Sequence, residues 1–287
     1  MQTIEEMIEI LDLEKIEDNI FRGKTYKTPW KRIYGGQVLA QSLQAAIRTV
    51  PDDRHLHSMH AYFILAGDID REVVYIVDDI RDGGSFTTRR VRAVQHGRDI
   101  FIMSASFQRE QDGKDHQNQL PDVPMPEDLK TDIEMAEIFK DMFPAIYKQF
   151  QIPRPIEFRP VEPFEKLYNG QHPPMRHVWM KAKGPLGDEL NAHKTALAYA
   201  SDYNLLTTAL IPHTFNINFS KLQMASLDHA MWFHRPFRMD DWLLYALESP
   251  SASGARGFTR GSVFDRKGRL VASVVQEGLI REPQKKQ

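Results

Sequence analysis

The stretch Gly35-Gly36-Gln37-Val38-Leu39-Ala40-Gln41-Ser42-Leu43-Gln44-Ala45-Ala46-Ile47 opens on two glycines, and its apolar residues recur at helical spacing. Pro51 stops this pattern, as expected just beyond a helix end. The stretches typical of β-strands that follow are 58–65, 73–80, 87–95 and 100–108. The last two flank His96-Gly97-Arg98, a typical hairpin turn. Residues 35–108 therefore predict one helix followed by an antiparallel sheet.

The same order of elements returns in the second half of the chain. Residues 196–210 carry apolar side chains at helical spacing, and strand-like stretches follow at 222–234, 242–249, 257–264 and 270–280. Short identities recur at a steady offset, which is 169 for His60-Ala61 and His229-Ala230, 170 for Tyr75 and Tyr245, and 171 for Thr88-Arg89 and Thr259-Arg260. A steady offset favours two copies of one unit over a chance likeness of short strands.

The region between the copies has a different composition. Residues 110–185 hold 11 of the 17 prolines, and the stretch 131–150 is predicted to form an amphipathic helix. Two strand-like pieces, 156–161 and 177–183, are expected to open the second copy, as residues 20–27 open the first. The predicted division is an N-terminal unit at 1–110, a Pro-rich linker with a helix at 111–150, and a C-terminal unit at 151–287.

One long helix against a strongly curved antiparallel sheet is the hotdog fold. The sequence therefore predicts the α+β class and a double hotdog, with two tandem units in one chain. A single unit leaves an edge of its sheet unpaired, so we expect the two copies to pair edge to edge.

The composition excludes several functions. The 37 Lys and Arg residues nearly balance 39 Asp and Glu, a net charge of −2, which argues against a dedicated nucleic-acid-binding protein. The absence of cysteine excludes a disulfide framework, a thiolate zinc site, an Fe–S cluster and a cysteine nucleophile. The sequence shows no apolar run of about 18–20 residues, the length that spans a membrane. The acidic start of the chain, without a basic n-region, and the missing Ser-Lys-Leu ending lead us to expect a cytoplasmic location.

The common catalytic signatures are missing from the sequence. It contains no Gly-x-Ser-x-Gly, Walker A, Gly-x-Gly-x-x-Gly or His-Glu-x-x-His motif. His55, His57 and His60 could suggest a metal site, but on a strand His60 would oppose the other two. Two surface histidines and one half-buried histidine are the simpler interpretation, and we expect neither a metal nor a cofactor.

Three polar residues of the second half stand in apolar settings. Asp202 lies late in the predicted helix, where the macrodipole disfavours a negative charge, so it has either a partner, a task or a solvent-facing position. Ser226 lies in an aromatic-rich strand, where a serine is most often structural. Gln276 interrupts an apolar strand two residues before Gly278, and the alternative to function is a bond to a neighbouring strand.

The chain resembles the type II acyl-CoA thioesterases of the TesB family along nearly its whole length. The residues that carry the resemblance are Tyr34-Gly35-Gly36-Gln37, Arg81-Asp82-Gly83-Gly84-Ser85-Phe86, Ala200-Ser201-Asp202, Leu227-Asp228-His229-Ala230-Met231-Trp232-Phe233-His234-Arg235-Pro236-Phe237, Ser251-Ala252-Ser253-Gly254-Ala255-Arg256-Gly257 and Val275-Gln276-Glu277-Gly278. The run from Leu227 to Phe237 is the most specific of them.

The resemblance implies a double-hotdog hydrolase that converts acyl-CoA to free acid and CoA, and that associates as a homodimer or homotetramer. Its catalytic set would fall on Asp202, Ser226 and Gln276, although the bacterial pattern has Thr where this chain has Ser226. In that set Asp202 would be the base that activates water, with Ser226 and Gln276 holding the water and the carboxylate. A covalent role for Ser226 is the alternative. The oxyanion would meet a backbone N–H or the amide of Gln276.

An acyl-CoA substrate also needs cations for its phosphates and an apolar channel for its chain. The arginines considered for the phosphates are Arg89, Arg90, Arg92, Arg235, Arg256 and Arg260, although a solvated sheet face explains them equally well. The residues considered for the channel are Met224, Met231, Trp232 and Phe233, with core packing as the alternative. Since the first helix has no carboxylate between Gly35 and Val50, we expect the first copy to be mostly structural.

Two other functions fit the same fold. A hotdog enoyl-CoA hydratase or acyl dehydratase would need an Asp–His pair near a helix start, and neither 35–44 nor 196–206 offers one. A non-catalytic acyl-CoA-binding protein would bind the substrate without releasing a thiol.

Overall fold

The computed structural model describes residues 1–29, 31–141, 143–167, 172–217 and 221–282. The first copy carries a short helix and two short strands before its central helix. Its elements are α1 (Ile4–Leu11), β1 (Glu14–Glu17), β2 (Ile20–Gly23), α2 (Gly35–Ile47), β3 (His55–Phe63), β4 (Val73–Asp82), β5 (Phe86–Gln95) and β6 (Arg98–Gln108). The predicted helix and all four predicted strands of this copy are present, with ends that shift by a few residues.

The linker and the second copy follow. The linker region forms η1 (Pro126–Asp128), α3 (Asp132–Met135), η2 (Ala136–Phe139), α4 (Pro144–Phe150) and α5 (Phe164–Leu167), the last of these after the first strand of the second copy. The second copy consists of β7 (Ile156–Pro160), β8 (Met175–Ala182), α6 (Leu190–Ser201), η3 (Leu206–Asn216), β9 (Gln223–Ser226), β10 (Asp228–Phe233), β11 (Leu243–Ser253), β12 (Arg256–Asp265) and β13 (Leu270–Arg281).

The strands of both copies form one antiparallel sheet in the order β1-β2-β4-β5-β6-β3-β10-β13-β12-β11-β8-β7, with β9 added beside β13. The two copies join where β3 pairs with β10, and the repeated dipeptides meet there, because His60 pairs with Ala230 and Ala61 pairs with His229. The expected edge-to-edge pairing is confirmed, and the fold is a double hotdog.

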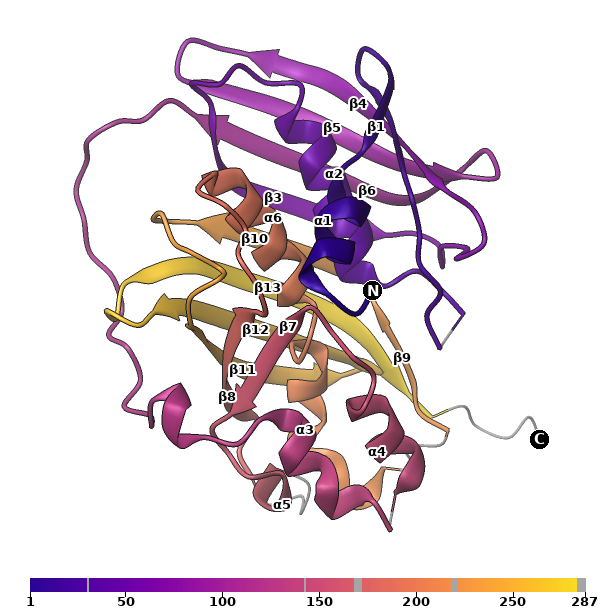
Figure 1. Cartoon of the computed structure of the whole chain (residues 1–287), viewed down its shortest axis with the longest axis vertical. Helices are drawn as coiled ribbons and strands as arrows, with labels where there is room; N and C mark the ends of the chain where they lie inside the picture. The colour runs from indigo at the N-terminus through magenta and orange to yellow at the C-terminus, as the bar shows by residue number, and fades with distance from the viewer. Residues whose placement is uncertain (30, 142, 168–171, 218–220, 283–287) are drawn as a thin grey trace.

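The two long helices lie side by side in the middle of the molecule, with the sheet of each copy wrapped around them (Figure 1). Their facing sides are rich in small residues, and alanines such as Ala46 and Ala198 are fully buried. Tyr34, at the start of α2, donates a hydrogen bond to the carbonyl oxygen of Tyr199, near the end of α6. The helices are therefore antiparallel, and the N-terminus of α2 meets the C-terminus of α6.

Three predicted elements are interrupted. The helix expected over 196–210 ends at Asp202, where Asn204 takes a positive φ of 66° before η3 begins, a conformation that asparagine tolerates better than most residues. The strand expected over 222–234 is split at Leu227 into β9 and β10. The helix expected over 131–150 breaks into short pieces, since Pro144 can start a helix but cannot continue one.

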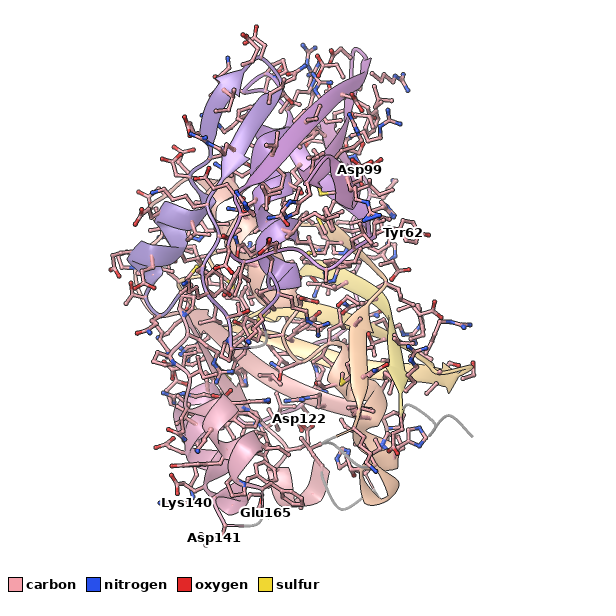
Figure 2. The ribbon with its side chains drawn as sticks, turned by 90° about the vertical axis from the view of Figure 1, so that its right-hand side faces the viewer. Tyr62, Asp99, Asp122, Lys140, Asp141 and Glu165 are labelled. Carbon is pink, nitrogen blue, oxygen red and sulfur yellow. The ribbon has the colours of Figure 1, made fainter. Side chains whose placement is uncertain are left out.

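The linker runs down the outside of the molecule from the first copy to the second (Figure 1). Its residues Leu120, Val123 and Leu129 pack on Trp179 and Trp242, on the outer face of the second sheet. The short helices form a second small core around Phe139 and Phe164 that includes Ile211 of η3. Figure 2 shows Lys140, Asp141 and Glu165 at the far end of this helical cluster. Among the described residues, no helix has both the length and the apolar character needed to cross a membrane.

Candidate active site

The carboxylate of Asp202 lies where the two central helices meet. Its Oδ2 accepts a hydrogen bond of 3.0 Å from the backbone N–H of Gly36, the second residue of α2. Its Oδ1 accepts bonds from Nε2 of Gln276 at 3.1 Å and from Oγ of Ser226 at 3.3 Å. The three residues singled out in the sequence thus form one cluster, and the first copy adds a fourth member.

Close helix packing places this N–H. A Cβ atom on Gly36 would lie 2.3 Å from the carbonyl oxygen of Tyr199 and 2.5 Å from the ring of Tyr34. Only glycine permits this approach without a shift of one helix. The contact also directs the positive end of the α2 dipole at Asp202, which compensates for its unfavourable place at the end of α6.

The strand side of the cluster is fixed by the sheet. Ser226 is the last residue of β9 and pairs with Gly278 of β13. A Cβ atom on Gly278 would lie 2.4 Å from Leu206 of η3, so this glycine lets η3 pack directly on the strand. Gln276 pairs with Thr259, whose hydroxyl donates to the Gln276 carbonyl oxygen.

The environment of Asp202 changes its acidity. Burial raises the pKa of Asp202, because a low-dielectric site disfavours the charged form. The hydrogen bonds from Gln276, Gly36 and Ser226 and the charge of Arg32 oppose this shift without cancelling it. A carboxylate with a raised pKa is a stronger base than an exposed one.

Asp202 opens onto a pocket of about 410 Å³ between the two copies. Ser226 also lines this pocket, whereas Gln276 is fully buried and lies behind the carboxylate. More than half of the lining residues come from the first copy, among them Gly35 and Phe63. The first copy, which we expected to be mostly structural, therefore also supplies lining residues of the pocket.

The arginines proposed for the CoA phosphates are engaged elsewhere. Arg89 is buried and forms ion pairs with Asp79 and Asp82. The other five each have a carboxylate partner and do not line the pocket; these are Arg90, Arg92, Arg235, Arg256 and Arg260. Arg32, which the sequence analysis missed, does line it. The feature of the sequence that could have indicated Arg32 is its position, two residues before Tyr34-Gly35-Gly36 at the start of α2.

The residues proposed for the acyl channel divide in a similar way. Met224 lines the pocket. Met231 and Phe233 belong to the hydrophobic core, and Trp232 packs its ring edge against His60 on the sheet. Of the four residues considered for the channel, Met224 alone lines this pocket.

The histidines do not form a metal site. His57 bonds to Ser106, His60 packs on Trp232 and His55 is exposed. No group of three or more His, Asp or Glu side chains that could hold a metal ion occurs among the described residues. His229 is close to the site but fully buried, with Nε2 bonded to Ser201 and a pKa lowered to about 3 by burial, so it is no base for Ser226.

Fold and site together define the class of the protein, a double-hotdog enzyme with a carboxylate pocket between its two helices. The family model described as acyl-CoA thioesterase matches residues 146–279, and the acyl-CoA thioesterase N-terminal domain matches residues 26–108. The chain belongs to the acyl-CoA thioesterase family, the enzymes that hydrolyse acyl-CoA thioesters.

Two named relatives and one solved structure are similar to this chain along nearly its whole length. Human acyl-coenzyme A thioesterase 8 is 41% identical over 95% of this chain and 88% of its own length. Acyl-CoA thioesterase 2 of Haemophilus influenzae is 39% identical and is covered to 96%, as is this chain. The crystal structure of the acyl-CoA thioesterase II TesB2 of Mycobacterium marinum has 45% identity and a TM-score of 0.81, with 96% of this chain and 98% of that chain covered.

Proposed function

We propose that Asp202 is the general base of acyl-CoA hydrolysis in this protein. The observation that carries the proposal is the single carboxylate held by three donors from both copies at the wall of the pocket. A carboxylate offers about four acceptor positions. Three are occupied by Gly36, Ser226 and Gln276, which leaves one for the water that attacks.

The chemistry needs little beyond this base. The water oxygen forms a bond to the thioester carbonyl carbon while Asp202 takes the water proton. The tetrahedral intermediate then collapses and the C–S bond breaks. The leaving thiolate has a pKa of roughly 8–9 and needs no strong acid to depart. The proton on Asp202 passes to the thiolate or to solvent, which restores the base.

We assign the oxyanion to the N-terminus of α2. Gly35, its first residue, lines the pocket, and its N–H has no acceptor among the described residues. Helix N-termini stabilise negative charge. The amide of Gln276 is less suited, since it donates to Asp202 and does not line the pocket.

Ser226 and Gln276 then have different roles. Ser226 touches the pocket and donates to Asp202, so it orients the carboxylate and the water. Gln276 is a positioning residue that acts on Asp202 from behind. A covalent role for Ser226 has less support, because the one hydrogen bond of its hydroxyl goes to a carboxylate and no histidine adjoins it among the described residues.

The test is hydrolysis by Asp202→Asn, followed through thiol release from an acyl-CoA. We expect kcat to fall by about 10²–10⁴-fold, the usual contribution of a positioned base. Asp228→Asn is the matched control, because Asp228 lies two residues from Ser226, outside the pocket, and bonds to the backbone of Glu277. Full activity in Asp202→Asn would rule out the proposed base.

Two further measurements separate the alternatives. An acyl group trapped on Ser226 and detected by mass spectrometry would replace water attack with a covalent route. Loss of enoyl absorbance without thiol release would indicate a hydratase, and binding without either signal would indicate a binding protein.

We also propose the division into units at 1–110 and 151–287 with a linker at 111–150, supported by the sheet order and by the separate family matches. Self-association as a dimer or tetramer is proposed as well. It is supported by apolar side chains such as Ile80 and Phe86 that the first copy leaves exposed, and light scattering would measure it. The cytoplasmic location stays a prediction.

A further inference from the structure

The lining of the pocket contains two chemically different groups of residues. We call the apolar side chains from the first copy the apolar arm, and we call the polar side chains the polar arm; the apolar arm consists of Ile33, Val38, Phe63, Ile64, Leu65, Ile100 and Phe101, and the polar arm of Arg32, Asn204 and Thr207. We infer that the substrate lies in one orientation, with its acyl chain along the apolar arm and the phosphates of CoA at Arg32. This inference rests on the proposed function and adds the direction of the substrate.

The floor of the apolar arm is built where β3 ends and β6 begins. The backbone N–H groups of Ile64 and Leu65 both donate to the carbonyl oxygen of Ile100, at 2.9 and 3.1 Å. The rings of Phe63 and Phe101 pack edge to face, with centroids 5.1 Å apart. Tyr62 and Asp99, each one residue before this floor, lie on the same side of the molecule in Figure 2. The floor is thus tied together by backbone bonds as well as by ring packing.

A second wall of the apolar arm comes from the segment that leads into α2. Ile33 donates its N–H to the carbonyl oxygen of Gly67 at 3.0 Å. A Cβ atom on Gly67 would lie 2.7 Å from the Ile33 side chain, so the two segments are in direct contact. Val38 of α2 continues this wall toward Asp202.

The apolar arm begins at the reacting group. The position of a Cβ atom on Gly35 lies 2.7 Å from Oδ2 of Asp202 and 3.0 Å from the ring of Phe63. The same ring therefore borders the carboxylate and the start of the arm. A thioester carbonyl beside Asp202 would place its first methylene groups against Phe63.

Two residues of the apolar arm are about half exposed to solvent. Ile64 is 50% exposed and Leu65 is 46% exposed, although both line the pocket. Covering such side chains with an alkyl chain is favourable, because it removes apolar surface from water.

The polar arm contains Arg32, a cation whose charge acts on Asp202 but which forms no close ion pair with the described residues. Arg32 is exposed, and one Nη atom donates to the carbonyl oxygen of Met224 at 3.1 Å. No carboxylate of the described residues lies within 4.0 Å of it, whereas all six arginines first considered have one. A guanidinium with free donors at a pocket mouth suits a phosphate or pyrophosphate group.

The apolar arm is tested by chain-length dependence. For Ile64→Asn we expect the ratio of kcat/KM for dodecanoyl-CoA to that for butanoyl-CoA to fall about tenfold, the loss of contact with about two methylene groups. Ile16→Asn is the matched control, because Ile16 is also 50% exposed but lies on β1, outside the pocket. Leu65→Asn provides a second variant of the same arm.

The polar arm is tested with a thioester that lacks phosphates. For Arg32→Gln we expect KM for an acyl-CoA to rise about tenfold relative to KM for the matching N-acetylcysteamine thioester. Arg90→Gln is the control, since Arg90 is exposed and paired with Asp78 on the sheet. If Arg32 only anchors β9 through Met224, both thioesters will lose activity equally, which overturns the phosphate assignment.

The two tests together decide the orientation. The expected result is that Ile64→Asn changes the chain-length ratio and Arg32→Gln changes the phosphate ratio. The reverse pattern, or no change in either ratio, would overturn the inference. Because both ratios compare substrates on one active variant, they stay separate from the Asp202→Asn test of the reaction itself.

Discussion

The two central helices end in opposite ways although they belong to copies of one unit. The residue that caps the C-terminus of α2 is Arg48, and the residue that caps α6 is Asp202. Arg48 suits the negative end of a helix dipole, and it also donates to the carbonyl oxygen of Leu13 and lies over the ring of Phe21. Asp202 opposes the dipole of its own helix and is held by the N-terminus of the other. The end that we propose to be catalytic is the end where the preference for a positive charge at a helix C-terminus is broken.

The strands of the two copies also differ in what their equivalent residues bind. Ser106 pairs with Thr88 in the first copy as Gln276 pairs with Thr259 in the second. The Ser106 hydroxyl bonds to His57 instead of to a carboxylate. The two copies thus share the register of the sheet. They differ in their side chains, because Gln276 of the second copy donates to the Asp202 carboxylate and the equivalent Ser106 of the first copy does not.

The segments that leave β3 and β10 differ as well. After β3, Ile64 and Leu65 are exposed and border the pocket. After β10, Arg235 forms an ion pair with Asp115 of the linker, and Phe237 joins the core. The linker therefore engages this segment of the second copy, whereas the equivalent segment of the first copy stays exposed beside the pocket.

Of the substitutions that test the difference between the two helix ends, Gly36→Ala should have the largest effect on activity. The added methyl group would meet the Tyr199 carbonyl oxygen at 2.3 Å, so the helices must separate and the N–H of residue 36 must move from Asp202. We expect kcat/KM to fall by about 10²–10³-fold, and the overpacking to cost about 1–3 kcal/mol of unfolding free energy. Steady-state kinetics and thermal unfolding measure the two effects.

Gly84→Ala is the matched control for this substitution. A Cβ atom on Gly84 has no heavy atom within 4 Å. Equal activity of the two variants would show that the first copy does not contribute to the site.

Gln276 and Ser106 occupy equivalent positions in the two copies, and substitutions at both give the next test. Gln276→Met keeps a similar volume but removes the amide that donates to Asp202. Since that bond lowers the pKa of Asp202, its loss raises the pKa further, and the acidic limb of the kcat/KM profile should move to higher pH. We expect kcat to fall about tenfold, whereas Ser106→Ala should shift neither value. An unchanged acidic limb in Gln276→Met would reduce Gln276 to a packing residue.

Much of the fold could be predicted because it is repeated. The offset near 170 and the strand alternation yielded the helix at 35–47, the strands and the pairing of the copies. The interruptions could not be predicted, because they depend on tertiary packing. The break after Asp202 needs Asn204 in a left-handed conformation, and the break at Leu227 arises where β9 and β10 both pair with β13.

Only part of the candidate site could be predicted from the sequence. Asp202, Ser226 and Gln276 could be proposed, since each is polar in an apolar setting and the family resemblance places them. Gly36 and Arg32 were missed as site residues for a physical reason. Gly36 acts through a backbone N–H that meets Asp202 across 166 positions of sequence, and no side-chain pattern reports such a contact.

The smallest expected effect is on the free energy of unfolding. Substitution of the cap residue should raise it at the end of α6 and lower it at the end of α2. The pKa of Asp202 is raised in the folded protein above its ordinary value of 3.8. Between these two pKa values the folded state keeps a proton that the unfolded state has released, so stability falls as the pH rises through this window. The ionised carboxylate therefore lowers stability at neutral pH, and a second cost comes from the dipole of α6.

Asp202→Asn should accordingly raise the unfolding temperature at pH 7, by an amount equivalent to about 1 kcal/mol. The Gln276 amide can rotate so that its buried Oε1, which has no donor among the described residues, accepts from the new amide. The gain should vanish below pH 3.8, where Asp202 is protonated in both states. Arg48→Ala should instead lower the unfolding temperature at both pH values, because it removes a favourable charge and the bond to Leu13. Destabilisation by both substitutions at pH 7 would mean that both helix ends are optimised for stability, which would contradict the proposal that Asp202 is kept at the end of α6 for catalysis.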